Sequence, residues 1–201
     1  MDALANERLK EIKAVVVGAS AGGIEAMMQI FSTLPADYPL PIICVLHMPD
    51  KHDSNLAEIF QQWTRIKVLD AEDKATIQKG SLYFAPAGYH LLIEDDATFS
   101  LSCEQPVNYS RPSIDLLMQT AANAYGKGIL GILLTGANFD GAMGMKAIKD
   151  QGGITIVQEP LDAKSVTMPK EAIKLQKPDL IQGLSDIKIM LLRLGDLNAV
   201  Q

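Results

Sequence analysis

Fully apolar runs alternate along the chain with segments whose hydrophobic residues recur every three or four positions. The apolar runs predict strands covered on both faces, because a half-exposed strand would alternate with polar residues. These runs lie at 13–18, 41–47, 128–136 and 154–158. Helical spacing occurs at 22–34, 54–65 (apolar side Leu56, Ile59, Phe60 and Trp63), 113–125, 140–151 and 168–175. A last helix is expected from Ser185, which suits an N-cap, with Asp186 in its first turn.

In the middle of the chain, strand-like segments follow one another closely without helical segments between them, at 67–71, 81–86, 90–95 and 99–103. Short turns separate the last three, which predicts an antiparallel meander attached to the main sheet. The alternation of buried strands and helices elsewhere predicts an α/β fold, namely a doubly wound, mostly parallel sheet in a three-layer αβα arrangement. We expect a charged lead-in at 1–12 and a single domain at 13–201.

Composition limits the classes of partner and compartment. The 201 residues carry a formal net charge of −6 without a Lys/Arg cluster, which argues against nucleic acid as a partner. No apolar run approaches the roughly 20 residues of a membrane span, and the N-terminus has no signal-peptide pattern. Cys44 and Cys103 have no CxxC spacing. We therefore expect a cytoplasmic protein without membrane insertion, metal or cofactor.

Three residues with complementary chemistry follow the ends of predicted parallel strands. Ser20 follows the first strand, His47 closes the second, and Asp140 comes shortly after the strand at 128–136. The carboxyl ends of parallel strands lie along one sheet edge, where open α/β sheets bind their ligands. A hydroxyl, an imidazole and a carboxylate meeting there would provide a nucleophile, its base and the group that orients the base.

Each of these residues also has a structural interpretation. Ser20 and Asp140 suit the N-caps of the helices that follow them, and His47 could serve packing alone. Residues 18–22 nevertheless read G-A-S-A-G, the pattern of a nucleophile elbow, in which the helix N-terminus behind the serine favours an oxyanion. Of the remaining histidines, His52 suits solvent and His90 a structural role.

Dinucleotide binding is a further alternative for the same turn. Gly18, Ser20 and Gly23 have the spacing of G-x-G-x-x-G, but serine replaces the glycine that lets a pyrophosphate approach the backbone. The next strand ends in His47, where this motif requires an acidic residue. Both departures count against a nucleotide site.

From Lys13 to its last helix, the chain resembles the catalytic domain of the chemotaxis protein-glutamate methylesterases, the CheB family. The resemblance rests, in order, on VVVGASAGGIEAM (15–27), LHMP (46–49), YFAPAGYHLLIE (83–94), RPSIDLL (111–117), LLTGANFDGAMGMKAIKDQGG (133–153) and MPKEAI (168–173). It implies a doubly wound fold and a serine hydrolase that demethylates glutamate methyl esters, and deamidates some glutamines, on the cytoplasmic region of methyl-accepting chemoreceptors. The family's nucleophile, base and aspartate fall on Ser20, His47 and Asp140.

The sequence departs from the family pattern in two places. Ala21 stands where many members have a hydroxyl residue after the nucleophile, and Ala137 and Asn138 stand where many read TGMG. Backbone N–H groups near Ala21 and Ala137 remain candidate oxyanion donors, with Asn138 beside them. Arg111 is a candidate contact for an acidic receptor surface, or a solvated side chain.

The resemblance also leaves the regulation and the activity open. The first strand begins at about residue 13, so we expect no N-terminal receiver domain and control, if any, by a separate regulatory protein. A shallow, open cleft is expected, because the ester lies on a bulky helical receptor. The alternatives are a hydrolase of another signalling system and a catalytically silent module that binds receptors.

Overall fold

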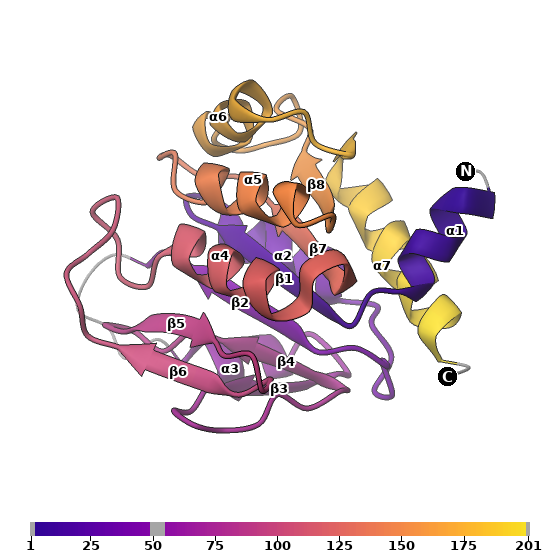
Figure 1. The fold of residues 1–201 in the computed structure, drawn as a ribbon, viewed down its shortest axis with the longest axis horizontal. Helices are drawn as coiled ribbons and strands as arrows, with labels where there is room; N and C mark the ends of the chain where they lie inside the picture. The colour runs from indigo at the N-terminus through magenta and orange to yellow at the C-terminus, as the bar shows by residue number, and fades with distance from the viewer. Residues whose placement is uncertain (1–2, 49–54, 200–201) are drawn as a thin grey trace.

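A seven-stranded parallel sheet forms the centre of the protein in a computed structural model, which describes residues 3–48 and 55–199 (Figure 1). The strand order is β3-β4-β2-β1-β7-β8-β9, and every pairing is parallel. The strands are β1 (Ala14–Ala19), β2 (Ile42–Leu46), β3 (Lys67–Asp70), β4 (Ser81–Phe84), β7 (Ile129–Leu133), β8 (Ile154–Gln158) and β9 (Leu180–Gln182). The chain winds outward from β1 in one direction, then returns to β7 on its other side. The sheet therefore has a switch point between β1 and β7.

Helices cover both faces of this sheet, as Figure 1 shows. One face carries α1 (Ala3–Lys10), α2 (Gly23–Phe31), α3 (Leu56–Gln61) and α7 (Leu184–Asn198), and the other carries α4 (Ile114–Tyr125), α5 (Ala142–Asp150) and α6 (Thr167–Leu175). A short 3-10 turn, η1 (Gly126–Gly128), leads from α4 into β7. Each face has its own buried apolar cluster, one around Met27 and Leu191, the other around Leu117 and Met145. The predicted doubly wound, three-layer α/β fold is confirmed.

The antiparallel part is smaller than the predicted meander. Only β5 (His90–Ile93) and β6 (Phe99–Ser102) pair antiparallel, in a separate two-stranded sheet against α4. The strand expected at 81–86 is instead β4, which pairs parallel with both β2 and β3. All four residues of β4 are buried, because the strand lies inside the main sheet and not at its border.

Two local predictions were wrong. In α3 only Leu56 and Phe60 are buried, whereas Ile59 and Trp63 are 41% and 61% exposed, because the helix ends at Gln61 and covers the sheet with one turn. Ser185 is not the N-cap of the last helix, because α7 begins at Leu184. The Leu184 N–H donates to Asp162 Oδ2 at 2.8 Å. Asp186 does lie in the first turn of α7. The expected start of the 54–65 helix and His52 lie outside the described residues.

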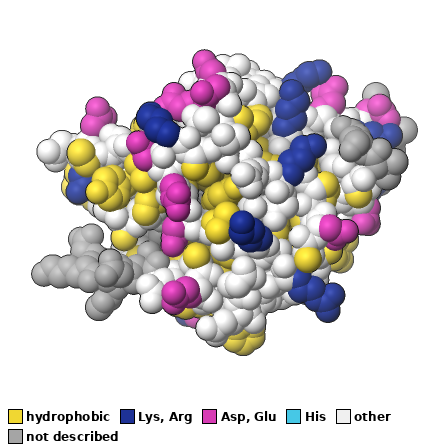
Figure 2. Space-filling view, turned by 90° about the horizontal axis from the view of Figure 1, so that it is seen from below, with side chains coloured by type: hydrophobic (Ala, Val, Ile, Leu, Met, Phe, Trp, Pro, Cys, Tyr) yellow, Lys and Arg dark blue, Asp and Glu magenta, His cyan; other side chains and the backbone are white. Residues whose placement is uncertain are grey.

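The lead-in, the helices, the surface charges and the two cysteines add four observations. The expected lead-in contains α1, and both Leu9 and Ile12 are buried in the core. None of the helices in the described ranges is long and apolar enough to span a membrane. On the face shown in Figure 2, basic side chains are interspersed with acidic ones. Cys44 is buried, Cys103 is exposed, and both are free thiols.

The contact between α4 and α5 requires a glycine, which gives a test of the packing. A Cβ at Gly144 would lie 2.5 Å from Met118 Cβ and 3.2 Å from Asp115 Cα. Gly144→Val should therefore lower the free energy of unfolding by about 1–3 kcal/mol, because the two helices must separate. Urea unfolding measures the change. Met143→Val, at an exposed position of the same helix, should stay within about 0.5 kcal/mol, and equal effects of the two substitutions would refute the close packing.

Candidate active site

The register of the central strands places the beginnings of three loops, those after β1, β2 and β7, at one edge of the sheet. Ala19 at the end of β1 pairs with Leu46 at the end of β2, so Ser20 and His47 come next at the same edge. The His47 N–H donates to the Ala19 carbonyl at 3.0 Å, and the Ser20 N–H donates to the Thr135 carbonyl at 2.9 Å. The loop after β7 therefore lies beside the loop after β1, at the switch point where open sheets bind ligands.

The turn that carries Ser20 is held from its backbone side. Gly22 is the N-cap of α2 with a φ of 81°, and a Cβ there would lie 2.7 Å from Lys164 Cβ. Thr135 Oγ1 donates to the Ala21 carbonyl and accepts the Ser165 N–H, both at 2.8 Å. No side chain caps α2, so the interpretation of Ser20 as a helix cap is wrong. The hydroxyl has no structural role at the helix end.

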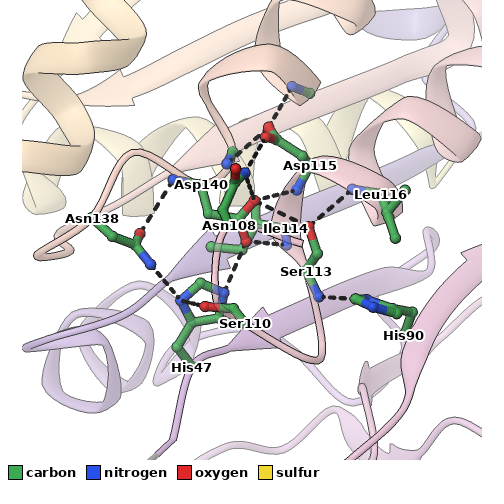
Figure 3. A network of polar contacts seen from close by, with 12 residues as sticks. His47, His90, Asn108, Ser110, Ser113, Ile114, Asp115, Leu116, Asn138 and Asp140 are labelled. Carbon is green, nitrogen blue, oxygen red and sulfur yellow. Dashed lines mark hydrogen bonds and ion pairs between the residues drawn. The ribbon is translucent and has the colours of Figure 1, made fainter. Parts of the chain in front are cut away.

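The imidazole of His47 is bound on one side by Asp140. Its Nε2 lies 3.0 Å from Asp140 Oδ2; the Asp140 side chain is buried, and the His47 side chain is partly buried (Figure 3). A carboxylate can only accept, so Nε2 carries the proton, and Nδ1 of the neutral ring has a free lone pair. Around Nδ1 lie the Asn138 Nδ2 at 3.4 Å and the Ser110 Oγ at 3.5 Å. These contacts are long, so Nδ1 remains available as a base.

Ser20 lies beside His47 along the sheet edge without being bonded to it. Among the hydrogen bonds of the described residues, none joins the Ser20 hydroxyl to either ring nitrogen. The structure thus brings His47 and Asp140 into contact, whereas the expected contact between Ser20 and His47 is not made.

Asp140 accepts hydrogen bonds from five donors. Oδ2 receives His47 Nε2 and the Ile114 N–H, the latter at 2.7 Å. Oδ1 receives the Ser113 hydroxyl at 3.0 Å, the Asp115 N–H at 3.1 Å and the Asn108 amide at 3.1 Å. Burial raises the pKa of Asp140, but the bonds from His47, Ile114 and Asn108 outweigh it and hold the pKa below its ordinary value. The group is therefore a carboxylate at neutral pH.

These donors also correct the capping interpretation of Asp140. The N-cap of its own helix, α5, is Gly141 in a left-handed conformation, and the Asp140 carboxylate accepts none of the first N–H groups of that helix. The carboxylate instead accepts the first N–H groups of α4, a helix from a different part of the chain. Asp140 is a helix-capping residue, but of the neighbouring helix.

A second buried carboxylate, Asp115, lies next to Asp140. Its Oδ1 accepts the N–H groups of Gly141 at 2.9 Å and Gly144 at 2.7 Å, and its Oδ2 accepts the Asn108 amide at 2.9 Å. Burial is the main cause that raises the pKa of Asp115 to about 6, and the charge of Asp140 adds to it. The sequence alone gave no signal for Asn108 or Ser110, and Asp115 was recognisable only as an acid in the first turn of a helix.

His90 and Arg111 support the loop before α4. His90 is buried; its Nδ1 accepts the Ser113 N–H at 3.1 Å, and its Nε2 lies 3.1 Å from the Gln105 carbonyl. This agrees with its expected structural role. Arg111 Nη1 donates to the carbonyls of Cys103 and Glu104 at 2.8 and 2.9 Å. The guanidinium is thus engaged by the protein's own backbone, and a contact with a receptor stays a prediction.

The N–H groups of Ala21 and Ala137 have no acceptor among the described residues, whereas the Gly136 N–H donates to the Ser165 carbonyl at 3.2 Å. The edge around them is open. A cavity of about 620 Å³ lies away from this edge, and a second cavity of about 150 Å³ lies behind the Ser20 turn, next to Gly22 and Thr135. Neither is lined by Ser20, His47 or Asp140. Over the same residues, no cluster of His, Cys, Asp and Glu could hold a metal.

Asp115 gives stability a specific pH dependence. Its folded-state pKa of about 6 exceeds the ordinary 3.8, so the folded protein binds this proton more tightly than the unfolded chain. The contribution of Asp115 to the free energy of unfolding therefore falls as the pH rises from about 4 to about 6. Asp115→Asn removes the titration, and the stability of this variant relative to wild type should rise across that window.

Urea unfolding at several pH values within the window measures this difference. Asp179→Asn is the matched control, because hydrogen bonds from Thr155 hold the pKa of Asp179 below its ordinary value despite its burial, and its titration lies at more acidic pH. A difference for Asp115→Asn that stays constant from about pH 4 to about pH 6 would contradict the raised pKa.

Comparison with known proteins places this geometry in a family. The CheB methylesterase family matches residues 15–191. A protein of Leptospira interrogans is 44% identical over 189 residues, which are 94% of this chain and 98% of that protein. The protein-glutamate methylesterase/protein-glutamine glutaminase of Archaeoglobus fulgidus is 38% identical over 164 residues, which are 80% of this chain and 47% of that protein.

A solved structure agrees with these sequence matches. The crystal structure of the Thermotoga maritima CheB methylesterase catalytic domain superposes with a TM-score of 0.86 at 30% identity, covering 91% of this chain and 98% of that one. The match extends over the parallel sheet and both helix layers. The chain belongs to the CheB methylesterase family.

Proposed function

We propose that the chain is a serine hydrolase that demethylates glutamate methyl esters, and deamidates glutamines, on the cytoplasmic region of chemoreceptors. Ser20 is the nucleophile, His47 the base and Asp140 the group that orients the base. The observation that carries the proposal is the His47 ring, which is bound through Nε2 to a buried carboxylate, while Nδ1 has only two long contacts at the sheet edge that holds Ser20. The names of the relatives supply the substrate class.

The reaction proceeds in two steps. His47 Nδ1 takes the hydroxyl proton as Ser20 Oγ attacks the ester carbonyl, and then returns it to the departing methoxide, which leaves as methanol. Water next attacks the acyl-enzyme, with Nδ1 again as base, and releases a glutamate side chain and free Ser20. With a glutamine substrate, the same steps release ammonia in place of methanol.

The electrostatics support this division of roles. Five donors and a lowered pKa keep Asp140 ionised, so it stabilises the imidazolium that forms at His47 without taking its proton. Because those donors include backbone N–H groups of α4, the carboxylate is fixed before the reaction begins.

The N–H groups of Ala21 and Ala137 are the proposed oxyanion donors. Both lie in loops at the site and lack acceptors within the described part of the chain. Backbone donors do not depend on the side chain, so the family departures at these positions leave this function intact. The Asn138 side chain, whose Oδ1 accepts the Asp140 N–H at 3.2 Å, holds the same loop.

The missing bond between Ser20 and His47 fits a site without substrate. Catalytic hydrogen bonds are often long in such states and tighten when the substrate binds. Ser20 then displaces the long contacts that Asn138 and Ser110 make to Nδ1. The open edge suits an ester carried on a receptor helix, and a separate regulatory protein is the proposed means of control.

The nucleophile can be tested by methanol release from methylated receptor. Ser20→Ala should reduce kcat by about 10³-fold or more, because the acyl-enzyme can then no longer form on the Ser20 oxygen. Ser32→Ala, on the surface of the protein, is the control and should behave as wild type.

Ser110→Ala separates two nucleophiles, because Ser110 Oγ is the hydroxyl nearest to Nδ1 in the structure. Ser20 is the wrong assignment if Ser110→Ala abolishes methanol release while Ser20→Ala retains it. Wild type that binds receptor and releases no methanol would instead identify a silent binding module.

A further inference from the structure

We propose that Asp115 is a positioning residue that holds the peptide next to Asp140, and thereby fixes the carboxylate that orients His47. The inference rests on the proposed role of Asp140 in catalysis. Asp115 is buried and takes no direct part in the proposed reaction.

The two carboxylates cap each other's helices. Asp140 precedes α5 and accepts the Ile114 and Asp115 N–H groups at the start of α4. Asp115 lies in the first turn of α4 and accepts the Gly141 and Gly144 N–H groups at the start of α5. Figure 3 shows both carboxylates between the two helix ends. Each helix therefore supplies the acceptor that the other helix needs at its N-terminus.

The bond from Gly141 explains why this arrangement controls Asp140. The Gly141 N–H belongs to the peptide that directly follows the Asp140 Cα, and it lies 2.9 Å from Asp115 Oδ1. Gly141 also has a φ of 95°, a conformation that favours glycine, and the backbone of a glycine can readily adopt other conformations. An acceptor at Asp115 is therefore what keeps this peptide in one orientation.

Asn108 completes the connection between the carboxylates. Its amide nitrogen donates to Asp115 Oδ2 at 2.9 Å and to Asp140 Oδ1 at 3.1 Å. Both partners are acceptors, so both amide protons are used in the bridge. Asp115 thus reaches Asp140 by two routes, through the backbone at Gly141 and through the Asn108 side chain.

Both glycine N–H groups bind the same atom, Asp115 Oδ1, and this makes the proposal testable. Asp115→Asn keeps the acceptor oxygen of the two glycine N–H groups and removes the charge. It also replaces the oxygen that accepts the Asn108 amide by an NH2 group, so it retains the backbone route through Gly141 alone. Asp115→Glu keeps the charge and moves the oxygens by one methylene. Asp115→Leu removes the acceptor and leaves two buried N–H groups unpaired.

With methylated receptor, Asp115→Asn should retain kcat within about fivefold, whereas Asp115→Glu and Asp115→Leu should each lose about 10²-fold in kcat at unchanged KM. A loss by the Asn variant as large as that of the Leu variant would overturn positioning through the Gly141 peptide, because that variant keeps the acceptor of both glycine N–H groups. Wild-type kcat in a folded Glu or Leu variant would overturn the proposal outright. If neither variant folds, the Asn variant still decides, because the proposal requires it to be active.

Proton NMR provides a readout that a purely structural role would not change. The His47 Nε2 proton shared with Asp140 gives a downfield resonance, which should persist in Asp115→Asn and shift or vanish in folded Asp115→Glu. Asp179→Leu is the control: this carboxylate accepts the Thr155 N–H and hydroxyl at 3.0 and 2.8 Å, in β8. It should lower Tm without affecting kcat or the resonance.

The two proposals fail in different ways. Full activity of Ser20→Ala would end the proposed nucleophile, while the resonance would still report whether Asp115 positions Asp140. An inactive Ser20→Ala variant, combined with wild-type kcat and resonance in folded Asp115→Glu, would leave the function standing and reject the role of Asp115.

Discussion

The buried carboxylate of Asp140 must find donors for both of its oxygens, and this requirement organises the edge of the sheet. A carboxylate without partners in the interior would become protonated and lose its use as an anion. Here the N-terminus of α4 supplies N–H groups and positive potential, and the imidazole of His47 supplies one more donor. The end of α4 and the imidazole of His47, the proposed base, are thus bound to the same two oxygens, so the folding of α4 and the orientation of His47 depend on each other.

Glycines at the starts of two helices make this close arrangement possible. Gly22 and Gly141 both adopt positive φ at the starts of α2 and α5, so each helix begins after a backbone turn and not after a capping side chain. The residues just before these turns, including Ser20 and Asp140, are then released from capping their own helices. A serine or an aspartate in this position can serve chemistry or, as with Asp140, a different helix.

The sequence predicted the strands β1, β2, β7 and β8 well, because fully apolar runs mark strands buried in a parallel sheet. It could not separate capping from catalysis at Ser20 and Asp140, since that depends on whether each helix starts at the following glycine. The sequence also did not predict that β4 pairs parallel, because the hydrophobic pattern of so short a strand does not tell a parallel pairing from an antiparallel one. Asn108 lies in a loop without periodicity, and its two carboxylate partners meet only through the packing of α4 on α5.

Two neighbouring carboxylates in the interior repel each other, and the protein distributes the donors unequally between them. Asp140 receives five, including the imidazole, and its pKa is lowered, whereas Asp115 receives three and burial raises its pKa to about 6. The unfavourable electrostatic energy of the pair therefore falls on Asp115, which is not the carboxylate bound to His47. In the proposed reaction His47 becomes an imidazolium, and this charge arises next to the carboxylate that is already ionised and fixed. Little reorganisation is then needed at that moment, which is the condition under which a preformed charge lowers a barrier most effectively.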